Sequence, residues 1–321
     1  MKKNFVKDAL LGVAVGDALG VPVEFRSRNE LTNNPVIDMR AMGSHRQLAG
    51  TWSDDSSLTF CLAEMLCNKY NVQDLANRFI NWKTYAYWTA YDKVFDIGIA
   101  TSAAIHAMAS GVPPLLAGGV EEDSNGNGSL MRILPLLFYI KDKPINERFR
   151  YINEVSSLTH RHIRSVIACF IYLEYALGII NGLSKYQAYE AMQKQVNSFL
   201  SENPICSQPE LDKFKRILPG TSDQDNFRNL YELEEDEIHS SGYVLHTLEA
   251  SIWCVLKTTG YKEAVLKAVN LGNDTDTTAA VAGGLAGLLY GEHTIPVEWM
   301  EVLAREKDID ELATRLYRKI Y

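Results

Sequence analysis

The sequence predicts an all-α protein, and three observations support this. Apolar residues recur three or four positions apart in most segments, which is the period of an amphipathic helix. Alternation of apolar and polar residues over the length of a strand is nearly absent. No low-complexity linker and no internal repeat divides the 321 residues. We therefore expect a single domain with one core over residues 1–321.

The clearest helical pattern lies in residues 56–70, where the apolar side chains share one helix face: Leu58, Cys61, Leu62, Met65 and Leu66. Similar spacing predicts helices over residues 98–110, 129–140, 163–181, 184–200, 243–259, 261–270, 278–290 and 308–320. Residues 26–52, 111–128 and 201–240 lack the pattern and are rich in Asn, Pro, Gly or acidic residues. Loops of this length in a compact domain are often functional.

The composition is that of a globular protein, with 46% hydrophobic and 22% charged residues. The net charge of −8 argues against a general nucleic-acid or anionic-membrane surface. Asp8 and Asp17 interrupt the N-terminal apolar stretch, so it is not a signal peptide, and no apolar run looks long and clean enough to span a membrane. Five cysteines without a CxxC motif favour reduced thiols in a cytoplasmic protein and disfavour zinc.

The stretch LGNDTDTTAAVAGGLAGLLYG, residues 271–291, places Asp274 and Asp276 just before an apolar run. Residues two apart point to different faces of a helix, so the two carboxylates converge only in a turn or at the first bend into a helix. A single Asp is enough to cap a helix. A second Asp among threonines offers more oxygen than a cap needs, so both helix capping and a site for a hard cation remain open.

A second acidic cluster, GTWSDDSSLTF at residues 50–60, has the same arrangement. Ser53, Asp54 and Asp55 precede the helix that contains Leu58, and capping again explains them in part. Together the two clusters offer four carboxylates and several hydroxyls, a ligand set that suits Mg²⁺ or Mn²⁺ better than zinc. Four carboxylates in one pocket would repel each other without cations, so two ions are expected. The pairing of the clusters is an inference.

A third motif, DSNGNGSLMRILPLL at residues 123–137, combines an Asn-Gly-rich turn with the start of an apolar segment. Such a turn can direct free N–H groups at a phosphate. Asn-Gly pairs are also ordinary turn residues, so a plain turn before a helix is the alternative.

These motifs occur in an order that resembles the ADP-ribosylglycohydrolase family. The stretches GVAVGDALGVPVEF, TWSDDSS, FDIG, NGNGSLMR, THRH, GYVLHTLEA and LGNDTDTTAAVAGGLAGLLYG follow one another between about residues 8 and 291. The resemblance is greatest to the bacterial dinitrogenase-reductase-activating branch. It implies a compact orthogonal all-α domain with a central cleft that holds two Mg²⁺ or Mn²⁺ ions.

The resemblance also implies a set of site residues. The expected metal ligands are Ser53, Asp54, Asp55, Asp274, Asp276 and Thr277, and Ser53 stands where the family usually has Thr. The expected contacts to ADP-ribose are Ser124, Gly126, Asn127 and Gly128 at the diphosphate, His160 in the cleft and Tyr243 near the adenosine.

Proton transfer is expected to involve Asp96, Glu24 or the metal ligand Asp55. From the residues alone, Glu24 reads as a surface acid after a helix end and Asp96 as a helix cap. The resemblance reverses both interpretations. For Asp96, the FDIG form is similar to the arginine-linked branch of the family. For Glu24, the family carries a Glu near the metals at the matching place. Asp17, inside an apolar helix, is expected to brace nearby backbone.

The resemblance implies a hydrolase that removes ADP-ribose from modified protein side chains, with arginine favoured as the linkage. The alternatives are a hydrolase of serine-linked or other O-linked ADP-ribose, and an immunity or binding protein that blocks an ADP-ribosylating toxin. The Asp-rich motif of prenyl-diphosphate synthases is a weaker match, because those enzymes need a carboxylate where this chain has Leu58. The expected partner is an ADP-ribosylated protein, with no nucleic acid and no membrane, and the protein is expected to be a monomer.

Overall fold

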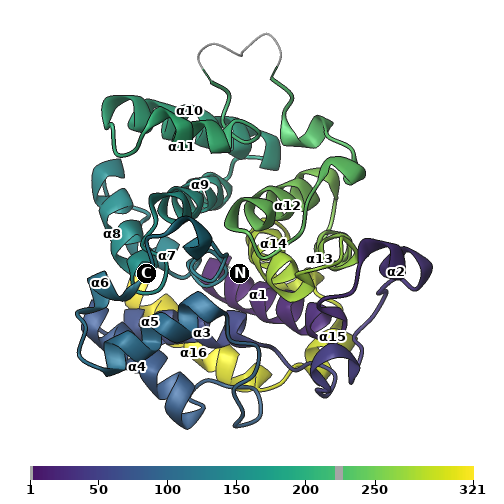
Figure 1. Cartoon of the computed structure of the whole chain (residues 1–321). Coiled ribbons are helices and arrows are strands. Elements are labelled where there is room, and N and C mark those ends of the chain that lie inside the picture. Colours follow the sequence, from purple (N-terminus) through teal and green to yellow (C-terminus); the bar gives the residue numbers. More distant parts are fainter. Residues whose placement is uncertain (1–2, 221–226) are drawn as a thin grey trace.

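The structure of the protein is a computed structural model that describes residues 3–220 and 227–321. Helices dominate these residues, which contain no strand (Figure 1). Backbone pairing between extended segments in the described ranges is limited to three isolated bridges: Met42 with Gln47, Gly119 with His160, and Gly126 with Tyr243. The prediction of an all-α fold is confirmed, while the extent of the domain, residues 1–321, stays a prediction.

The α-helices of the described residues follow one another around a central pair, α1 and α14 (Figure 1). Their bounds are α1 Phe5–Gly20, α2 Arg28–Asn33, α3 Asp54–Leu66, α4 Val72–Tyr85, α5 Ile99–Ala109, α6 Pro114–Ala117, α7 Leu136–Ile140, α8 Ile145–Ser157, α9 Ile163–Ile180, α10 Lys185–Glu202, α11 Gln208–Leu211, α12 Val244–Lys257, α13 Tyr261–Asn270, α14 Thr275–Tyr290, α15 Val297–Val302 and α16 Glu306–Ile320.

One predicted helix is largely wrong. Of residues 129–140 only Leu136–Ile140 forms a helix, and residues 128–132 form turns. Pro135 explains the late start, because it lacks an N–H and disfavours helical backbone in the residue before it. The other predicted helices agree with the structure to within a few residues. Part of the predicted loop 201–240, residues 221–226, lies outside the described residues.

Helices α1 and α14 pack with their backbones in direct contact. A Cβ atom added to Gly16 would lie 2.1 Å from the carbonyl oxygen of Ala279, and one added to Gly20 would lie 2.3 Å from the Cα of Asp276. The seam between the two helices consists of glycines spaced four apart on α1 and their counterparts on α14: Gly12, Gly16, Gly20, Gly283 and Gly287. Only glycine allows this approach. The seam therefore fixes the start of α14 against the end of α1.

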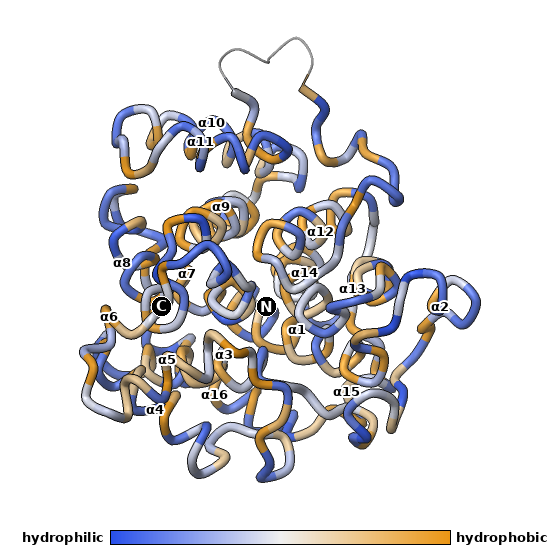
Figure 2. Tube along the Cα trace, viewed as in Figure 1, coloured by the Kyte–Doolittle hydropathy of each residue, from blue (hydrophilic) through white to orange (hydrophobic). Residues whose placement is uncertain are grey.

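The core is one continuous cluster of apolar side chains from most of the helices. The apolar segments gather on the inner helices, whereas α10, α11 and the loops are more hydrophilic (Figure 2). Helix α9 is long and apolar enough to cross a membrane, contrary to the sequence prediction, but 83% of it is buried inside the protein. Burial of this kind is the property of a core helix.

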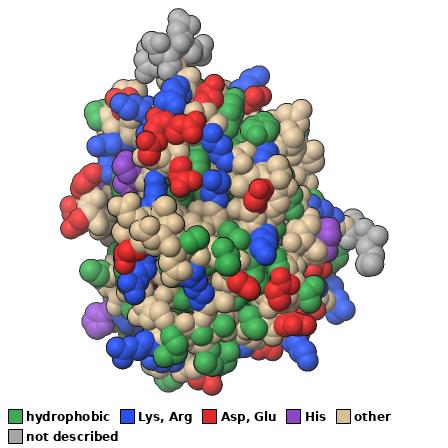
Figure 3. All heavy atoms as spheres, turned by 90° about the vertical axis from the view of Figure 1, so that its right-hand side faces the viewer, with side chains coloured by type: hydrophobic (Ala, Val, Ile, Leu, Met, Phe, Trp, Pro, Cys, Tyr) green, Lys and Arg blue, Asp and Glu red, His purple; other side chains and the backbone are tan. Residues whose placement is uncertain are grey.

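Charged side chains of both signs are interspersed on the face drawn in Figure 3. Ion pairs between partly exposed side chains include Arg228 with Glu237 and Lys267 with Glu235. The negative net charge is therefore not gathered into one surface patch on this face.

Candidate functional site

The two acidic motifs meet at the N-terminal ends of α3 and α14. Ser53 is the N-cap of α3, and its Oγ donates to Asp55 Oδ2 at 3.0 Å. The hydroxyl of Thr277, in the first turn of α14, lies 3.4 Å from the same oxygen. The pairing of the motifs, separated by 222 residues at this contact, is therefore present in the structure. The shared geometry supports the interpretation that both helix starts serve one site.

Asp274 and Asp276 take different positions at the start of α14. Asp274 is the N-cap residue and Asp276 lies in the first turn, because the helix begins at Thr275, three residues before the predicted start. Asp276 is fully buried and accepts a hydrogen bond from the N–H of Thr277 at 2.9 Å. The expected bend is thus the junction between a cap and a first turn, which lets two residues two apart face the same space.

Asp17 holds the start of α3 in place, as the sequence predicts. Its carboxylate accepts hydrogen bonds from the N–H groups of Ser53 and Ser56 at 2.9–3.0 Å and from Ser56 Oγ at 2.6 Å. These contacts satisfy N–H groups that have no partner within the helix. Burial raises the pKa of Asp17 to about 6, and the hydrogen bonds oppose that rise. Asp17 therefore links α1 to the Ser53–Asp55 motif.

Three buried carboxylate oxygens in this region have no hydrogen-bond partner among the described residues: Asp55 Oδ1, Asp274 Oδ1 and Asp276 Oδ2. Buried oxygens normally have a partner. Burial raises the pKa values of Asp54, Asp55 and Asp276 well above the usual aspartate range, and neighbouring carboxylates raise them further. Unpaired hard oxygens in a pocket of mutually repelling carboxylates fit a divalent cation.

Glu24 and Asp96 lie beside this cluster. Oxygen or nitrogen atoms of Glu24, His45, Asp96 and Asp276 all lie within 4.8 Å of one another. Glu24 is only 5% exposed, so its interpretation from the residues alone as a surface acid is wrong. Asp96 does not cap the following helix, because Gly98 is the N-cap of α5. The structure therefore brings both candidate proton-transfer residues to the acidic site.

His45 is a member of this group that the sequence reasoning missed. It belongs to the short 3₁₀ turn Gly43–His45, inside the unpatterned segment 26–52, and its Nε2 pairs with Glu24 Oε2. Burial raises the pKa of Glu24 to about 7, the hydrogen bond with His45 opposes that rise, and the charge of Asp96 adds to it. The only sequence signal for His45 was the length of the loop.

The Asn-Gly loop lies against the residues before α12. The N–H of Asn127 donates to the carbonyl of Gly242 at 3.0 Å, and the N–H of Val244 donates to the carbonyl of Asn125 at 3.0 Å. The N–H groups of Gly126 and Gly128 donate to no partner in the described ranges. Free N–H groups on a glycine-rich turn can donate to an anion.

Asn127 joins the loop to the acidic site. Its side-chain amide donates to Asp274 Oδ2 at 2.7 Å and to Thr247 Oγ1 at 2.8 Å. Since its backbone N–H also has a partner, both kinds of donor on Asn127 are engaged within the protein. The structure therefore favours a connecting role for Asn127 over the predicted direct contact with a ligand.

His160 packs against the glycines of the loop. A Cβ atom on Gly128 would lie 2.7 Å from His160 Cε1, and one on Gly126 would lie 3.5 Å from its Nε2. The ring is 2% exposed, and its Nδ1 is 2.8 Å from Thr159 Oγ1. Burial, helped by the charge of Arg132, lowers the pKa of His160 to about 3, so the ring is neutral at pH 7.

Tyr243 and Ser124 lie at the other end of the loop. The Tyr243 hydroxyl accepts a hydrogen bond from Arg164 at 3.1 Å, and Arg164 also pairs with Glu122 and Glu210. Ser124 ends the 3₁₀ turn that contains Glu122. The buried Arg164, which sequence reasoning missed, thus ties this end of the loop to α9 and α11.

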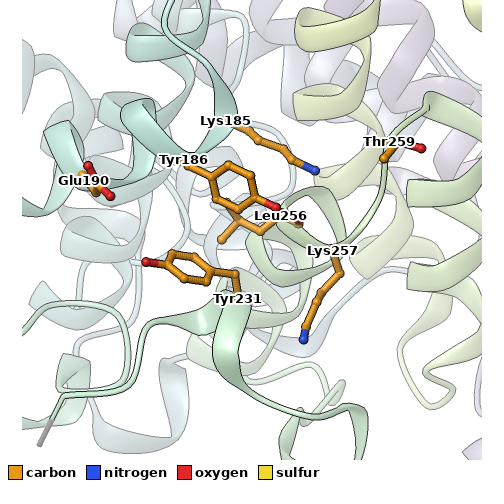
Figure 4. A pocket seen from close by; sticks show the side chains of 7 residues that line it. All are labelled: Lys185, Tyr186, Glu190, Tyr231, Leu256, Lys257 and Thr259. Carbon is orange, nitrogen blue, oxygen red and sulfur yellow. Dashed lines mark hydrogen bonds between the residues drawn. The ribbon is translucent and has the colours of Figure 1, made fainter.

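Two surface cavities lie away from the acidic site. One of about 500 Å³ between α10, Tyr231 and the end of α12 is lined by Lys185, Tyr186, Glu190, Tyr231, Leu256, Lys257 and Thr259 (Figure 4). Another of about 900 Å³ runs along α10 and α11. Neither contains a predicted site residue, so the expected cleft over the carboxylates stays a prediction.

Known proteins resemble this chain over most of its length. The family model of the ADP-ribosylglycohydrolases matches residues 2–321. The ADP-ribosylarginine hydrolase Tri1 of Pseudomonas putida (strain GB-1) is 32% identical over 314 residues, which are 97% of this chain and 77% of that protein. The ADP-ribosyl-dinitrogen reductase glycohydrolase of Rhodospirillum rubrum is 26% identical over 303 residues, 92% of this chain and 88% of that protein.

Comparison of the fold with solved structures points to the same family. A solved structure of an ADP-ribosylglycohydrolase-related protein complex superposes with a TM-score of 0.79 at 29% identity and covers 100% of both chains. The match of the family model over nearly the whole length, together with the two acidic motifs at the starts of α3 and α14, identifies the chain as a member of the ADP-ribosylglycohydrolase family.

Proposed function

We propose that the protein is a metal-dependent hydrolase that removes ADP-ribose from modified arginine side chains of proteins. The observation that carries the proposal is the convergence of two helix starts and two further carboxylates, Glu24 and Asp96, at one buried acidic site. The relative from P. putida is named for hydrolysis of ADP-ribosylarginine, which supports the choice of linkage.

Two Mg²⁺ or Mn²⁺ ions are proposed to be held by the oxygens of Ser53, Asp54, Asp55, Asp274, Asp276 and Thr277. The unpaired oxygens of Asp55, Asp274 and Asp276 support this assignment. When bound, divalent ions at such a site supply charge stabilisation and lower the pKa of a coordinated water. Hydroxyl and carboxylate oxygens suit Mg²⁺ and Mn²⁺ equally, so the ligands indicate a hard divalent cation without distinguishing these two ions.

Two carboxylates beside the proposed metal site, Glu24 and Asp96, are proposed to act on the substrate. Asp96 is proposed to accept two charge-assisted hydrogen bonds from the guanidinium of the leaving arginine. Glu24 is proposed to transfer the proton, which its pKa of about 7 supports, because a group with that pKa exchanges protons readily at neutral pH. Asp55 is proposed to affect catalysis through its position as a metal ligand.

ADP-ribose is proposed to bind along the Asn-Gly loop, with the diphosphate on the N–H groups of Gly126 and Gly128 beside Ser124. His160 packs against these glycines, and the hydrogen bond from Asn127 to Asp274 fixes the loop relative to the acidic site. Tyr243 pairs with Gly126 through the backbone, so it lies beside the proposed diphosphate loop, and it is proposed to contact the adenosine.

A cytoplasmic location and a monomeric state complete the proposal. The five cysteines of the chain are free, and free thiols are usual in a reducing compartment.

The test compares ADP-ribosyl-arginine and ADP-ribosyl-serine peptides with Mg²⁺, with Mn²⁺ and with excess chelator. We expect release of ADP-ribose from the arginine peptide, lost on chelation and restored by either ion. Asp276→Asn is expected to abolish release, whereas Asp142→Asn, the same change at a carboxylate that is 84% exposed, is expected to leave it unchanged. Faster cleavage of the serine peptide would assign the O-linked activity instead, and ADP-ribose binding without turnover of either peptide would indicate a binding protein.

A further inference from the structure

Three aromatic rings stand in a row beside the carboxylates Glu24 and Asp96. The ring of His45 lies between Phe25, at 5.9 Å between centroids, and Phe95, at 5.2 Å. His45 pairs with Glu24, and Phe95 directly precedes Asp96 in the chain. We call these three rings the aromatic row. It combines π faces with carboxylates in one place.

Both the side chain and the backbone of Phe25 are in unfavourable arrangements. Its side chain is 71% exposed although it is apolar. Its backbone has a φ of 65°, the left-handed region that bulky side chains rarely adopt. Packing therefore does not explain a phenylalanine here, and strain of this kind in a folded protein is often kept for function.

The backbone around Phe25 is nonetheless fixed. Its N–H donates to the carbonyl of Asn273 at 2.7 Å, and the N–H of Asn273 donates to the carbonyl of Arg26 at 2.7 Å. Asn273 directly precedes Asp274 of the acidic motif. The exposed ring thus stands at a defined place next to the proposed metal site.

His45, the central ring of the row, is also tied to the site. Ser44 Oγ donates to the carbonyl of Glu24 at 2.5 Å, and the neighbouring His45 pairs with the Glu24 side chain. The loop that carries them lies so close to the chain before Glu24 that a Cβ on Gly43 would be 1.8 Å from the carbonyl oxygen of Pro22. These contacts therefore hold His45 and Glu24 together.

We propose that the aromatic row is a specificity element that selects a planar cationic leaving group, the guanidinium of ADP-ribosyl-arginine. This inference rests on the proposed function and deepens it. A guanidinium is planar and cationic, it stacks on aromatic faces, and it pairs with carboxylates through two parallel hydrogen bonds. A serine hydroxyl gains neither contact. The row supplies the faces, Asp96 supplies the in-plane acceptor, and His45 is a positioning residue for Glu24.

The test uses Phe25→Gly and Phe95→Leu in the full chain with metal. For each we expect kcat/KM on the arginine-linked peptide to fall roughly three- to thirty-fold, the range for loss of one cation–π contact. Affinity for free ADP-ribose, measured by calorimetry, is expected to stay unchanged. Glycine suits the backbone at position 25, so the Tm of Phe25→Gly is expected to be kept, which separates a role in recognition from one in folding.

Tyr85→Ala is the matched control. It removes a ring that is 77% exposed and makes no ring contact within the described part of the chain, so kcat/KM should not change. Two results with an active wild type would show that the aromatic row has no role in specificity while the proposed function stands. One is that both Phe variants keep the wild-type kcat/KM on the arginine peptide. The other is that their affinity for ADP-ribose falls by the same factor as their kcat/KM. If the wild type binds ADP-ribose but does not cleave the arginine peptide, the proposed function fails and the inference fails with it.

Discussion

A single added methyl group should separate the roles of two glycines in the Asn-Gly loop. In Gly128→Ala the new Cβ would lie 2.7 Å from His160 Cε1 and 2.8 Å from Thr101 Oγ1. Ordinary contact begins near 3.4 Å, so the overlap with the ring is 3.4 − 2.7, or 0.7 Å. His160 and Thr101 are 2% and 1% exposed and have little room to retreat. The loop must therefore shift instead.

The expected loss follows from that overlap. Forcing extra volume into a packed site costs about 1–3 kcal/mol. If the whole cost appears as displacement of the N–H groups of Gly126 and Gly128, the Kd for ADP-ribose rises roughly 5- to 150-fold. Gly126→Ala is the matched control, because its Cβ would be 3.5 Å from the nearest atom, which is ordinary contact. It should bind ADP-ribose within about two-fold of the wild type.

The assay is calorimetric titration of each variant with ADP-ribose in metal-containing buffer, with circular dichroism to confirm that the helices are intact. Both variants replace glycine by alanine, so their effects on the unfolded chain are similar and the difference between them reports the local contact. Equal affinities for the two variants, or a larger loss in Gly126→Ala, would refute the assignment of the loop as a rigid diphosphate site.

The other predictions concern charge. A metal ion at one hundred times its Kd adds about 2.7 kcal/mol to the free energy of unfolding for each site that it occupies. The unfolding entropy is roughly 2.1 cal/mol/K for each of the 321 residues, so this free energy corresponds to a rise in Tm of about 4 °C for one ion and about 8 °C for two. Calorimetric scans should show that rise for Asp142→Asn but not for Asp276→Asn, and an equal rise in both would contradict the ligand assignment. Asp96→Asn should slow hydrolysis of the arginine-linked peptide about ten- to a hundred-fold, since charge-assisted hydrogen bonds contribute roughly 1.5–3 kcal/mol; initial rates with unchanged ADP-ribose affinity check this, and an unaltered rate would exclude a role for its charge. Burial raises the pKa of Glu24 from 4.5 to about 7, so the folded state favours the proton and the metal-free protein should lose stability as the pH rises through that interval. Glu24→Gln should reduce this loss in Tm measurements with chelator without removing it, because buried aspartates such as Asp17 also have raised pKa values. An identical pH profile would show that Glu24 is not one of the groups involved.

Local sequence patterns predicted those parts of the site that depend on helix starts. Asp54, Asp55, Asp274 and Asp276 were recognisable because polar residues before an apolar helix mark its N-terminus. The same reasoning did not list α4 or α8 as helices. Helix α4 does have the apolar spacing of an amphipathic helix, since its buried residues lie along one face: Leu75, Ala76, Phe79 and Trp82.

Contacts between distant segments were not predictable in the same way. His45 reaches Glu24 from a loop without periodicity, and Arg164 reaches Glu122 and Glu210 from inside an apolar helix. Neither position has a local pattern, because its importance arises only when the chain is folded. Glu24 is the clearest case, since its neighbours in the sequence indicate a surface acid whereas the fold buries it.

The glycine seam between α1 and α14 has a mechanical consequence. At Gly16 and Gly20 the two helices meet through backbone atoms, with no side chain of α1 between them. Their separation is therefore set by van der Waals contact between backbone atoms and cannot be adjusted by a change of rotamer. Asp17 and Asp276, one on each helix, are consequently aligned by this direct backbone contact. Substitutions elsewhere in the core should lower the melting temperature well before they disturb the distance between these two carboxylates, so the geometry of the proposed site should tolerate changes that weaken the fold.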